Sequence, residues 1–306
     1  MTTVAANRFE VAQEHEAAVR RHVSLVAIPR SGRLGEVAVE MRDLLAERID
    51  ELDAEPVLLD LMLASIEGNV VTILQALQHD IGCERQEPPT AAIEYARRLA
   101  QRGVPVYALV RAYRLGQQFL LRRAFGTSTE LGGGEDVRAE AYDRIVQQVF
   151  DYIDWISQRV VVVYEEERET WLAHQSNARQ GTVRRLLDGG DVDLVAAQRA
   201  LGYRLSSVHH LAVVAWTSTP AEPGDHLGGS IRTIREFAEE IGGGAPLVVD
   251  CDQATAWAWV PVPRDWRFDE GLAGWRSVGR PGTVLAVGSS RPGVEGFRRS
   301  HAEALS

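Results

Sequence analysis

IVQQVFDYIDWISQRVVVV, residues 145–163, is the stretch of sequence that decides the fold. Its apolar side chains recur at a mixture of three- and four-residue spacings, which predicts a helix with one apolar stripe. The stripe consists of Ile145, Val149, Tyr152, Ile156, Val160 and Val163. The helical pattern continues to Leu187, and one unbroken helix of this extent would be about 75 Å long at about 1.5 Å per residue.

The stripe has two interpretations. It is either the buried face of an ordinary core helix, or a coiled-coil-like seam through which two copies of the chain dimerise. We favour the seam, because a helix of this length is longer than one domain needs. The helix would then also couple the domains on its two sides.

The sequence before this helix is almost entirely helical in its apolar spacing, beginning at Phe9. Gly103 followed by Pro105 indicates the end of one helix and the start of the next. The polar, glycine-rich stretch at 127–135 is typical of a surface loop. An all-α domain is therefore expected over residues 1–135.

The sequence after Gly189 and Gly190 mixes strand and helix patterns. Strands are predicted at 211–216 and 283–287, with a hairpin at 247–260 and helices at 231–241, 270–278 and 292–305. This mixture predicts an α+β domain with a mainly antiparallel sheet over residues 190–306. The predicted fold is multi-domain, with the coupling and dimerisation helix at 136–189 between the two domains.

Composition restricts the classes of function. The formal net charge is -10 over 306 residues, which works against binding to a phosphate backbone within this chain. Cys83 and Cys251 have no paired spacing, so neither a disulfide nor a metal site is expected. No stretch approaches the roughly 18 apolar residues of a membrane span, and the N-terminus lacks the pattern of a secretory signal. We expect a soluble, cytoplasmic protein without a membrane contact.

Two stretches resemble known regulatory proteins. YARRLAQRG at 95–103 with PVYALVRAYRLG at 105–116 is similar to the helical N-terminal domain of RsbR-type stress regulators and PucR-type regulators. GVEGFRRSHAEA at 293–304 resembles the end of the degenerate GGDEF-like domain of CdaR and PucR transcription factors. The resemblance implies a globin-like helical domain, a GGDEF-like domain and a helix-turn-helix output. Because that output is missing here, we expect Ser306 not to be the natural end, and DNA to be bound only through the missing C-terminal domain.

The residues that a diguanylate cyclase uses are absent. Trp216 is followed by Thr217-Ser218-Thr219, without a carboxylate for Mg²⁺, and the hairpin carries Asp250-Cys251-Asp252-Gln253 in place of glycines and acids. We interpret the latter as an Asx-rich turn. We therefore predict a non-enzymatic protein with no catalytic residue, metal or cofactor. A divergent nucleotide cyclase or phosphodiesterase-like enzyme is the alternative.

The helix predicted from Val106 onward carries the candidate contact residues for an effector or partner. These are Arg111, Tyr113, Arg114, Gln117 and Gln118. The arginines and Gln118, with Arg122, form a cationic face that is either simply solvated or a docking surface for an acidic partner or an anionic effector. Tyr113 and Gln117 fall on the apolar face, where a buried amide needs hydrogen-bond partners.

Haem has to be considered for a globin-like helical domain. His79 follows an apolar helix stripe, but it has no second ligand at helical spacing, and we predict no haem. The leading hypothesis is a homodimeric sensor with an unknown small-molecule effector or protein partner. A protein-interaction scaffold of the RsbR type is the second.

Overall fold

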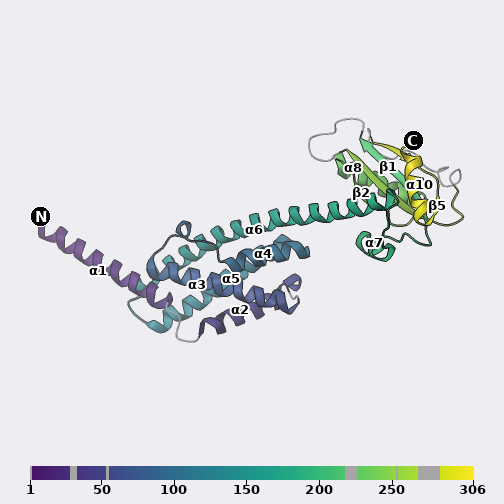
Figure 1. Cartoon of the computed structure of the whole chain (residues 1–306). Coiled ribbons are helices and arrows are strands. Elements are labelled where there is room, and N and C mark those ends of the chain that lie inside the picture. The colour runs from purple at the N-terminus through teal and green to yellow at the C-terminus, as the bar shows by residue number, and fades with distance from the viewer. Residues whose placement is uncertain (1, 28–32, 53–54, 218–225, 253, 268–282) are drawn as a thin grey trace. The chain divides into compact units, whose positions relative to one another are not determined.

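The computed structural model describes residues 2–27, 33–52, 55–217, 226–252, 254–267 and 283–306. The chain divides into two compact units, a helical unit at 1–171 and an α+β unit at 172–306 (Figure 1). The predicted fold class, all-α followed by α+β with a long helix, is confirmed. The boundary between the units falls within the long helix, whereas we had expected it at residues 136 and 189. The helix predicted at 270–278 lies outside the described residues.

The helical unit is built from long helices and two short 3₁₀ turns. They are α1 (Thr2–Ala27), α2 (Arg33–Arg48), η1 (Asp50–Leu52), α3 (Pro56–His79), η2 (Cys83–Arg85), α4 (Thr90–Arg102), α5 (Val106–Leu131) and the first part of α6 (Glu135–Leu187). Gly103 ends α4 with a φ of 71°, which glycine adopts without strain, and Pro105 caps α5. The predicted loop at 127–135 is shorter than expected, because α5 continues to Leu131.

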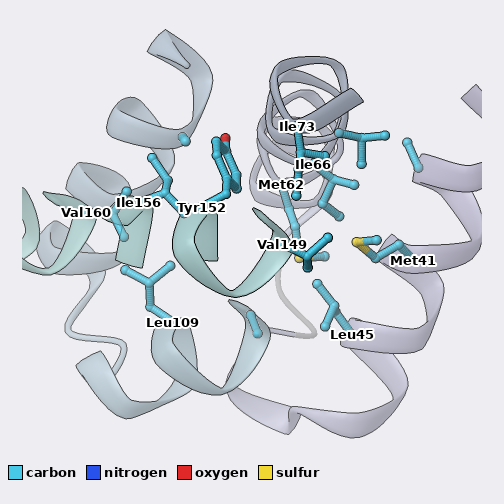
Figure 2. Close-up of a cluster of buried hydrophobic side chains, with 14 of the residues drawn as sticks. Met41, Leu45, Met62, Ile66, Ile73, Leu109, Val149, Tyr152, Ile156 and Val160 are labelled. Carbon is cyan, nitrogen blue, oxygen red and sulfur yellow. The ribbon is translucent and has the colours of Figure 1, made fainter. Parts of the chain in front are cut away.

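The first part of α6 forms the centre of the helical core. Ile145, Tyr152 and Ile156 are each at most 2% exposed and belong to one core with side chains of α2, α3, α4 and α5. Figure 2 shows Tyr152 and Ile156 with labelled residues of α2, α3 and α5. Val149 and Val160 are also buried, and Val163 packs against this core from its edge.

The structure therefore favours the other interpretation of this stripe, the buried face of a core helix, and dimerisation stays a prediction. Helical spacing shows that one face is buried, and it does not identify what covers that face. Here the face is covered by helices of the same chain.

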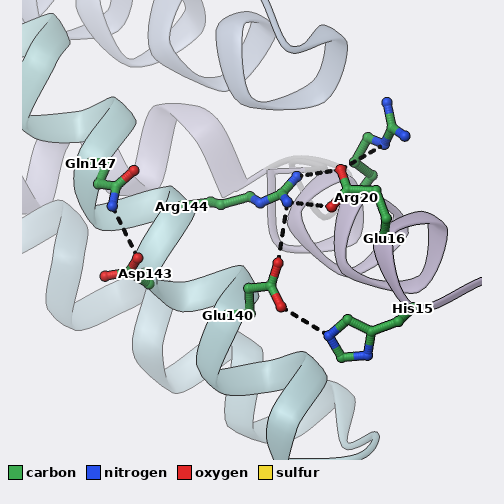
Figure 3. A network of polar contacts seen from close by, with 7 residues as sticks. All are labelled: His15, Glu16, Arg20, Glu140, Asp143, Arg144 and Gln147. Atoms are coloured by element: carbon green, nitrogen blue, oxygen red, sulfur yellow. Dashed lines mark hydrogen bonds and ion pairs between the residues drawn. The ribbon is translucent and has the colours of Figure 1, made fainter. Parts of the chain in front are cut away.

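A polar network attaches α1 to α6 (Figure 3). The Arg144 guanidinium donates to both carboxylate oxygens of Glu16, at 2.8 and 2.5 Å, and also to Glu140 at 3.2 Å. His15 Nε2 lies 2.8 Å from the other Glu140 oxygen. Hydrogen bonding from Arg144 lowers the pKa of Glu16 from its ordinary value. These groups are partly exposed, so the network fixes the position of α1 more than it adds to stability.

Among the described residues, α3 is the helix long and apolar enough to cross a membrane by length and composition. Its buried side chains, including Met62, Ile66 and Ile73, belong to the core of the helical unit. A buried core helix of a soluble protein passes the same test, so α3 is weak support for a membrane span.

The α+β unit contains an antiparallel sheet with the strand order β2-β3-β1-β4, and a short strand β5 that also pairs with β1. Its elements are α7 (Leu194–Leu201), β1 (His209–Thr217), α8 (His226–Glu240), β2 (Leu247–Asp250), β3 (Thr255–Val262), β4 (Thr283–Val287), β5 (Arg291–Pro292) and α10 (Gly293–Ala304). The predicted strands and the hairpin are confirmed to within a few residues.

The central strand β1 is buried on both faces. Leu211, Val213 and Ala215 contribute to one cluster with Ile234 and Phe237 of α8. The alternate residues Ala212 and Val214 contribute to a second cluster, which includes side chains from the end of α6 and from α10. Successive side chains of a strand point to opposite faces, which explains why residues 211–215 form a continuous apolar run.

The final helix α10 is held by the residues of the GVEGFRRSHAEA motif. The Phe297 ring stacks on Trp259 with centroids 4.0 Å apart, and the Ser300 hydroxyl accepts a hydrogen bond from the Ala212 N–H at 2.8 Å. A Cβ on Gly296 would lie 2.5 Å from the Arg291 backbone, so only glycine fits there. Hydrogen bonds from Ser289, with the Arg291 guanidinium nearby, lower the pKa of Glu303 to about 2. The motif therefore has a packing role.

His301 of α10 makes the stability of this unit sensitive to acid. It is 5% exposed, its ring lies 4.4 Å from that of Trp257, and burial lowers its pKa to about 4. The unfolded chain binds a proton near the ordinary pKa of about 6.5, so stability falls as the pH decreases from about 6.5 to 4. The contribution of this one group is about 1–3 kcal/mol.

We predict that His301→Leu flattens the pH dependence of the unfolding free energy between pH 6.5 and 4. Urea unfolding measured at several pH values tests this. His174→Leu, at an exposed position of α6, serves as the control and should keep the wild-type slope. Equal slopes for His301→Leu and wild type would contradict the assignment.

Candidate effector site in the helical unit

The structure separates the predicted contact residues of α5. Arg111 and Arg114 are exposed, and Gln117 is half-buried. Tyr113 points into the core, where it lines a small cavity of about 60 Å³ with Asn69 and Tyr152. Gln118 lines a surface groove instead. The five residues therefore do not form one site.

The small cavity adjoins a buried polar cluster. The Tyr152 hydroxyl donates to Asn69 Oδ1 at 2.8 Å, and Asn69 Nδ2 donates to the Ser65 carbonyl oxygen at 2.8 Å. Burial raises the pKa of Tyr152 and of Tyr113 above the ordinary tyrosine value, so both stay protonated. At about 30 Å³ per water, this space holds about two waters, which is too little for an organic effector.

A much larger cavity of about 390 Å³ lies between five helices of the same unit. Its walls are mostly aliphatic. They are formed by Val26 and Ala27 of α1, Leu34 and Val37 of α2, Val70, Ile73, Leu74 and Leu77 of α3, Leu120, Arg123, Ala124, Gly126, Thr127 and Glu130 of α5, and Ile145 and Val149 of α6. The volume falls in the range of small-molecule sites, and the apolar walls with a few polar groups are typical of such sites.

The polar groups of the large cavity lie on one side. Arg123, Thr127 and Glu130 are spaced by four and three residues along α5, so they share one helix face. The Arg123 guanidinium donates to Glu40 Oε2 of α2 at 2.9 Å. Arg123 also lines the surface groove, together with Arg48, Gln118 and Arg122. Gly126 and Glu130 are exposed and Arg123 is partly exposed, so this side of the cavity is its opening to solvent, and Arg123 joins it to the cationic groove.

Sequence patterns did not find this cavity. Its walls come from segments between residues 26 and 149, and each aliphatic wall residue has the pattern of an ordinary core position of its own helix. The cationic face of α5 was recognised through Arg122 and Gln118, and the neighbouring Arg123 lines the same groove although it lies off that helix face. Arg123 was the residue through which this cationic segment could have pointed to the cavity.

His79 does not belong to this cavity. It is exposed near the end of α3, and the described residues that line the cavity include no His, Cys, Met or Tyr. These walls offer no side chain of the kinds that hold haem iron.

The hairpin turn between β2 and β3 is a weaker candidate. Asp252 Oδ1 accepts hydrogen bonds from the N–H groups of Ala254 and Thr255, both at 2.8 Å, which confirms the Asx-turn interpretation. Within the part of the chain that the structure describes, no three His, Cys, Asp or Glu side chains gather as metal ligands. Gln253 lies outside that part.

We predict that Tyr152→Phe lowers the unfolding free energy of the helical unit by about 1–2 kcal/mol, because Asn69 Oδ1 loses its buried donor. Tyr142→Phe is the matched control on the same helix. The Tyr142 hydroxyl is 3.5 Å from its acceptor, the Leu121 carbonyl oxygen, so this change should cost less than about 0.5 kcal/mol. Urea denaturation of both variants measures the difference. Equal losses would show that the Tyr152–Asn69 hydrogen bond contributes nothing.

Comparison with known proteins identifies both units. Residues 35–179 match the family model described as the RsbT co-antagonist protein rsbRD N-terminal domain, and residues 186–306 match that of the GGDEF-like domain. Searches of curated proteins and of solved structures gave no match. The two family models together support a regulatory or sensory protein. The chain combines an RsbRD N-terminal domain with a GGDEF-like domain.

Proposed function

We propose that this chain is the non-catalytic sensory part of a cytoplasmic PucR/CdaR-type transcription regulator. An effector or partner bound by the helical unit would change the α+β unit, and a DNA-binding domain outside residues 1–306 would supply the output. The order of the two family matches supports this proposal. The transcriptional part predicts that the full-length gene product binds duplex DNA more tightly than residues 1–306 alone do.

The observation that carries the proposal is that one helix contributes to two cores. Ile145 and Ile156 of α6 are buried in the helical unit, and Val183 and Leu186 of the same helix are buried in the α+β unit. A helix is stiff along its axis, so a change in how its first part packs can act on its last turns. The mechanism is a shift between two populations of packing.

The last turns of α6 contact the hairpin turn that carries the catalytic signature in active cyclases. Gln180 Nε2 donates to the carbonyl oxygens of Asp250 and Cys251, at 3.1 and 3.4 Å. Arg298 of α10 donates to the Leu186 carbonyl oxygen at 2.5 Å. In the proposed relay, this turn receives the signal from α6 and performs no chemistry.

Native-state hydrogen exchange tests the relay. Ile156→Val removes one buried methylene from the helical core and should weaken it by about 0.5–1.5 kcal/mol. If the loss of stability lowers the opening free energy of the hairpin by about 1 kcal/mol or less, the backbone amides of residues 247–252 exchange about two- to fivefold faster. The control Val162→Ala is at a position of α6 that is 53% exposed, and it should leave them unchanged.

Insertion of four glycines after Trp171 interrupts α6 and should abolish the effect of Ile156→Val on the hairpin. Identical exchange in Ile156→Val and wild type, with α6 intact, would contradict the relay. Formation of a cyclic nucleotide from GTP or ATP with Mg²⁺ would contradict the non-catalytic part of the proposal.

A protein-interaction scaffold is the second candidate function. The name of the matching N-terminal model describes co-antagonists of RsbT, and the groove lined by Arg48, Gln118 and Arg122 offers a cationic surface to a partner. Analytical ultracentrifugation distinguishes the two functions. A homodimer is expected for the regulator. Because the Ile145–Val163 stripe is buried within the helical unit, that dimer would form through another surface. A large closed assembly would favour the scaffold.

A further inference from the structure

The large cavity of the helical unit combines an apolar interior with a polar opening that carries Arg123, Thr127 and Glu130 and adjoins the cationic groove. Val70, Ile73 and Leu77 of α3 form one apolar wall, opposite Leu120 of α5. A ligand body with many polar groups would lose its hydrogen bonds to water here without replacement. The interior therefore selects an apolar body. At about 30 Å³ for each water-sized group, 390 Å³ holds about a dozen methylene-sized groups.

Arg123 determines the chemistry at the opening. Its guanidinium gives Nη1–H to Glu40, and a guanidinium has five N–H donors in a planar fork, so donors remain for a second carboxylate. Its side chain is 37% exposed, which places it at the boundary between cavity and solvent. Thr127 follows one turn later on the same face of α5 and adds a hydroxyl.

The groove beside the opening favours an anion, although Glu130 at the opening is acidic and Glu40 is ion-paired with Arg123. Arg48, Arg122 and Arg123 line the adjoining groove, although the whole chain has a net charge of -10. Local positive potential of this kind attracts anionic ligands. A carboxylate at Arg123 forms charge-assisted hydrogen bonds, which are stronger than neutral ones.

We propose that the large cavity binds an amphipathic carboxylate, with its hydrocarbon chain inside the cavity and its carboxylate at Arg123. The ligand would contact Ile145 and Val149 of α6, the helix whose packing carries the signal in the function proposed above, and the inference rests on that function. It adds the chemical class of the effector.

Isothermal titration calorimetry on residues 1–306 tests the ligand class. The probes are hexanoate, octanoate and decanoate, each below the concentration at which it self-associates, and decanol as the uncharged analogue. Affinity should rise about fourfold for each added methylene, the ratio that corresponds to the transfer of one CH₂ out of water. Decanoate should bind about tenfold more tightly than decanol.

Three variants test the role of the opening. Arg123→Gln should lower the affinity for decanoate about tenfold and leave that for decanol unchanged. Glu40→Gln should raise the affinity for decanoate, because it removes the carboxylate that competes for Arg123. Arg98→Gln is the matched control, since Arg98 is also partly exposed and ion-paired, with Glu94 of its own helix α4, and it should change neither affinity.

A fourth variant tests the cavity itself. A Cβ at Gly126, which lines the cavity, meets no other atom within 4 Å, so Gly126→Phe can be accommodated in the helix. The substitution should lower the affinity for decanoate more than the affinity for hexanoate. Gly181→Phe, at a similarly open position of α6 in the α+β unit, should lower neither affinity.

Absence of binding by all three acids would overturn the inference, as would equal affinities for decanoate and decanol or an unchanged affinity in Arg123→Gln. Such a result is distinguishable from a failure of the proposed function. Binding is measured directly on the chain, whereas the relay is measured by the effect of Ile156→Val on the hairpin. A working relay without decanoate binding would overturn only the ligand class.

Discussion

The structure depends on one constraint, which is that α6 is a single helix with side chains in two different cores. Tyr152 and Ile156 complete the helical core, and Leu186 is buried among Trp259 and Phe297 of the α+β unit. Between them, residues 169–175 are exposed except for Trp171, which is half-buried. A short isolated helix is marginal in water because nucleation is costly. The exposed stretch is helical because both of its ends are already fixed in packed cores.

In the proposed function, this constraint is the physical means of regulation. Ile145 and Val149 are at once wall residues of the large cavity and members of the buried stripe of α6. A ligand in the cavity would therefore act on the helix directly, without an intermediate element. At the other end, Gln180 holds the backbone of the β2–β3 turn. In the proposed relay, the GGDEF-like unit receives the signal at that turn.

Local sequence signals predicted the helices and strands well, but they did not predict which elements pack against one another. The helix boundary predicted from Gly103 and Pro105 was correct, because a left-handed glycine and the fixed φ of proline act within a few residues. Ser128 was assigned to a loop, although it lies in α5, because its neighbours are polar. A tertiary contact stabilises that last turn, namely the hydrogen bond between His22 Nε2 and the Ser128 hydroxyl at 2.9 Å. No local pattern contains that contact.

The candidate site was less predictable than the fold, for the same reason. The Ile145–Val163 stripe was recognised as a buried face, but the helices that cover it are other elements, from α2 to α5, and the seam was assigned to a second copy. The large cavity is a gap between five helices, so it has no motif. Only the packing-specific motif at 293–304 was informative at long range, because Gly296 and Ser300 each require a close neighbour from another element.

The most direct test of the shared helix is the hydrogen exchange of the backbone amides of residues 169–175 in the intact chain. A continuous α6 predicts that they exchange much more slowly than in a free peptide of the same sequence, because each N–H is hydrogen-bonded four residues back in a helix anchored at both ends. Exchange at the rates of the free peptide would show that the two units are joined by a flexible linker, and would contradict the account.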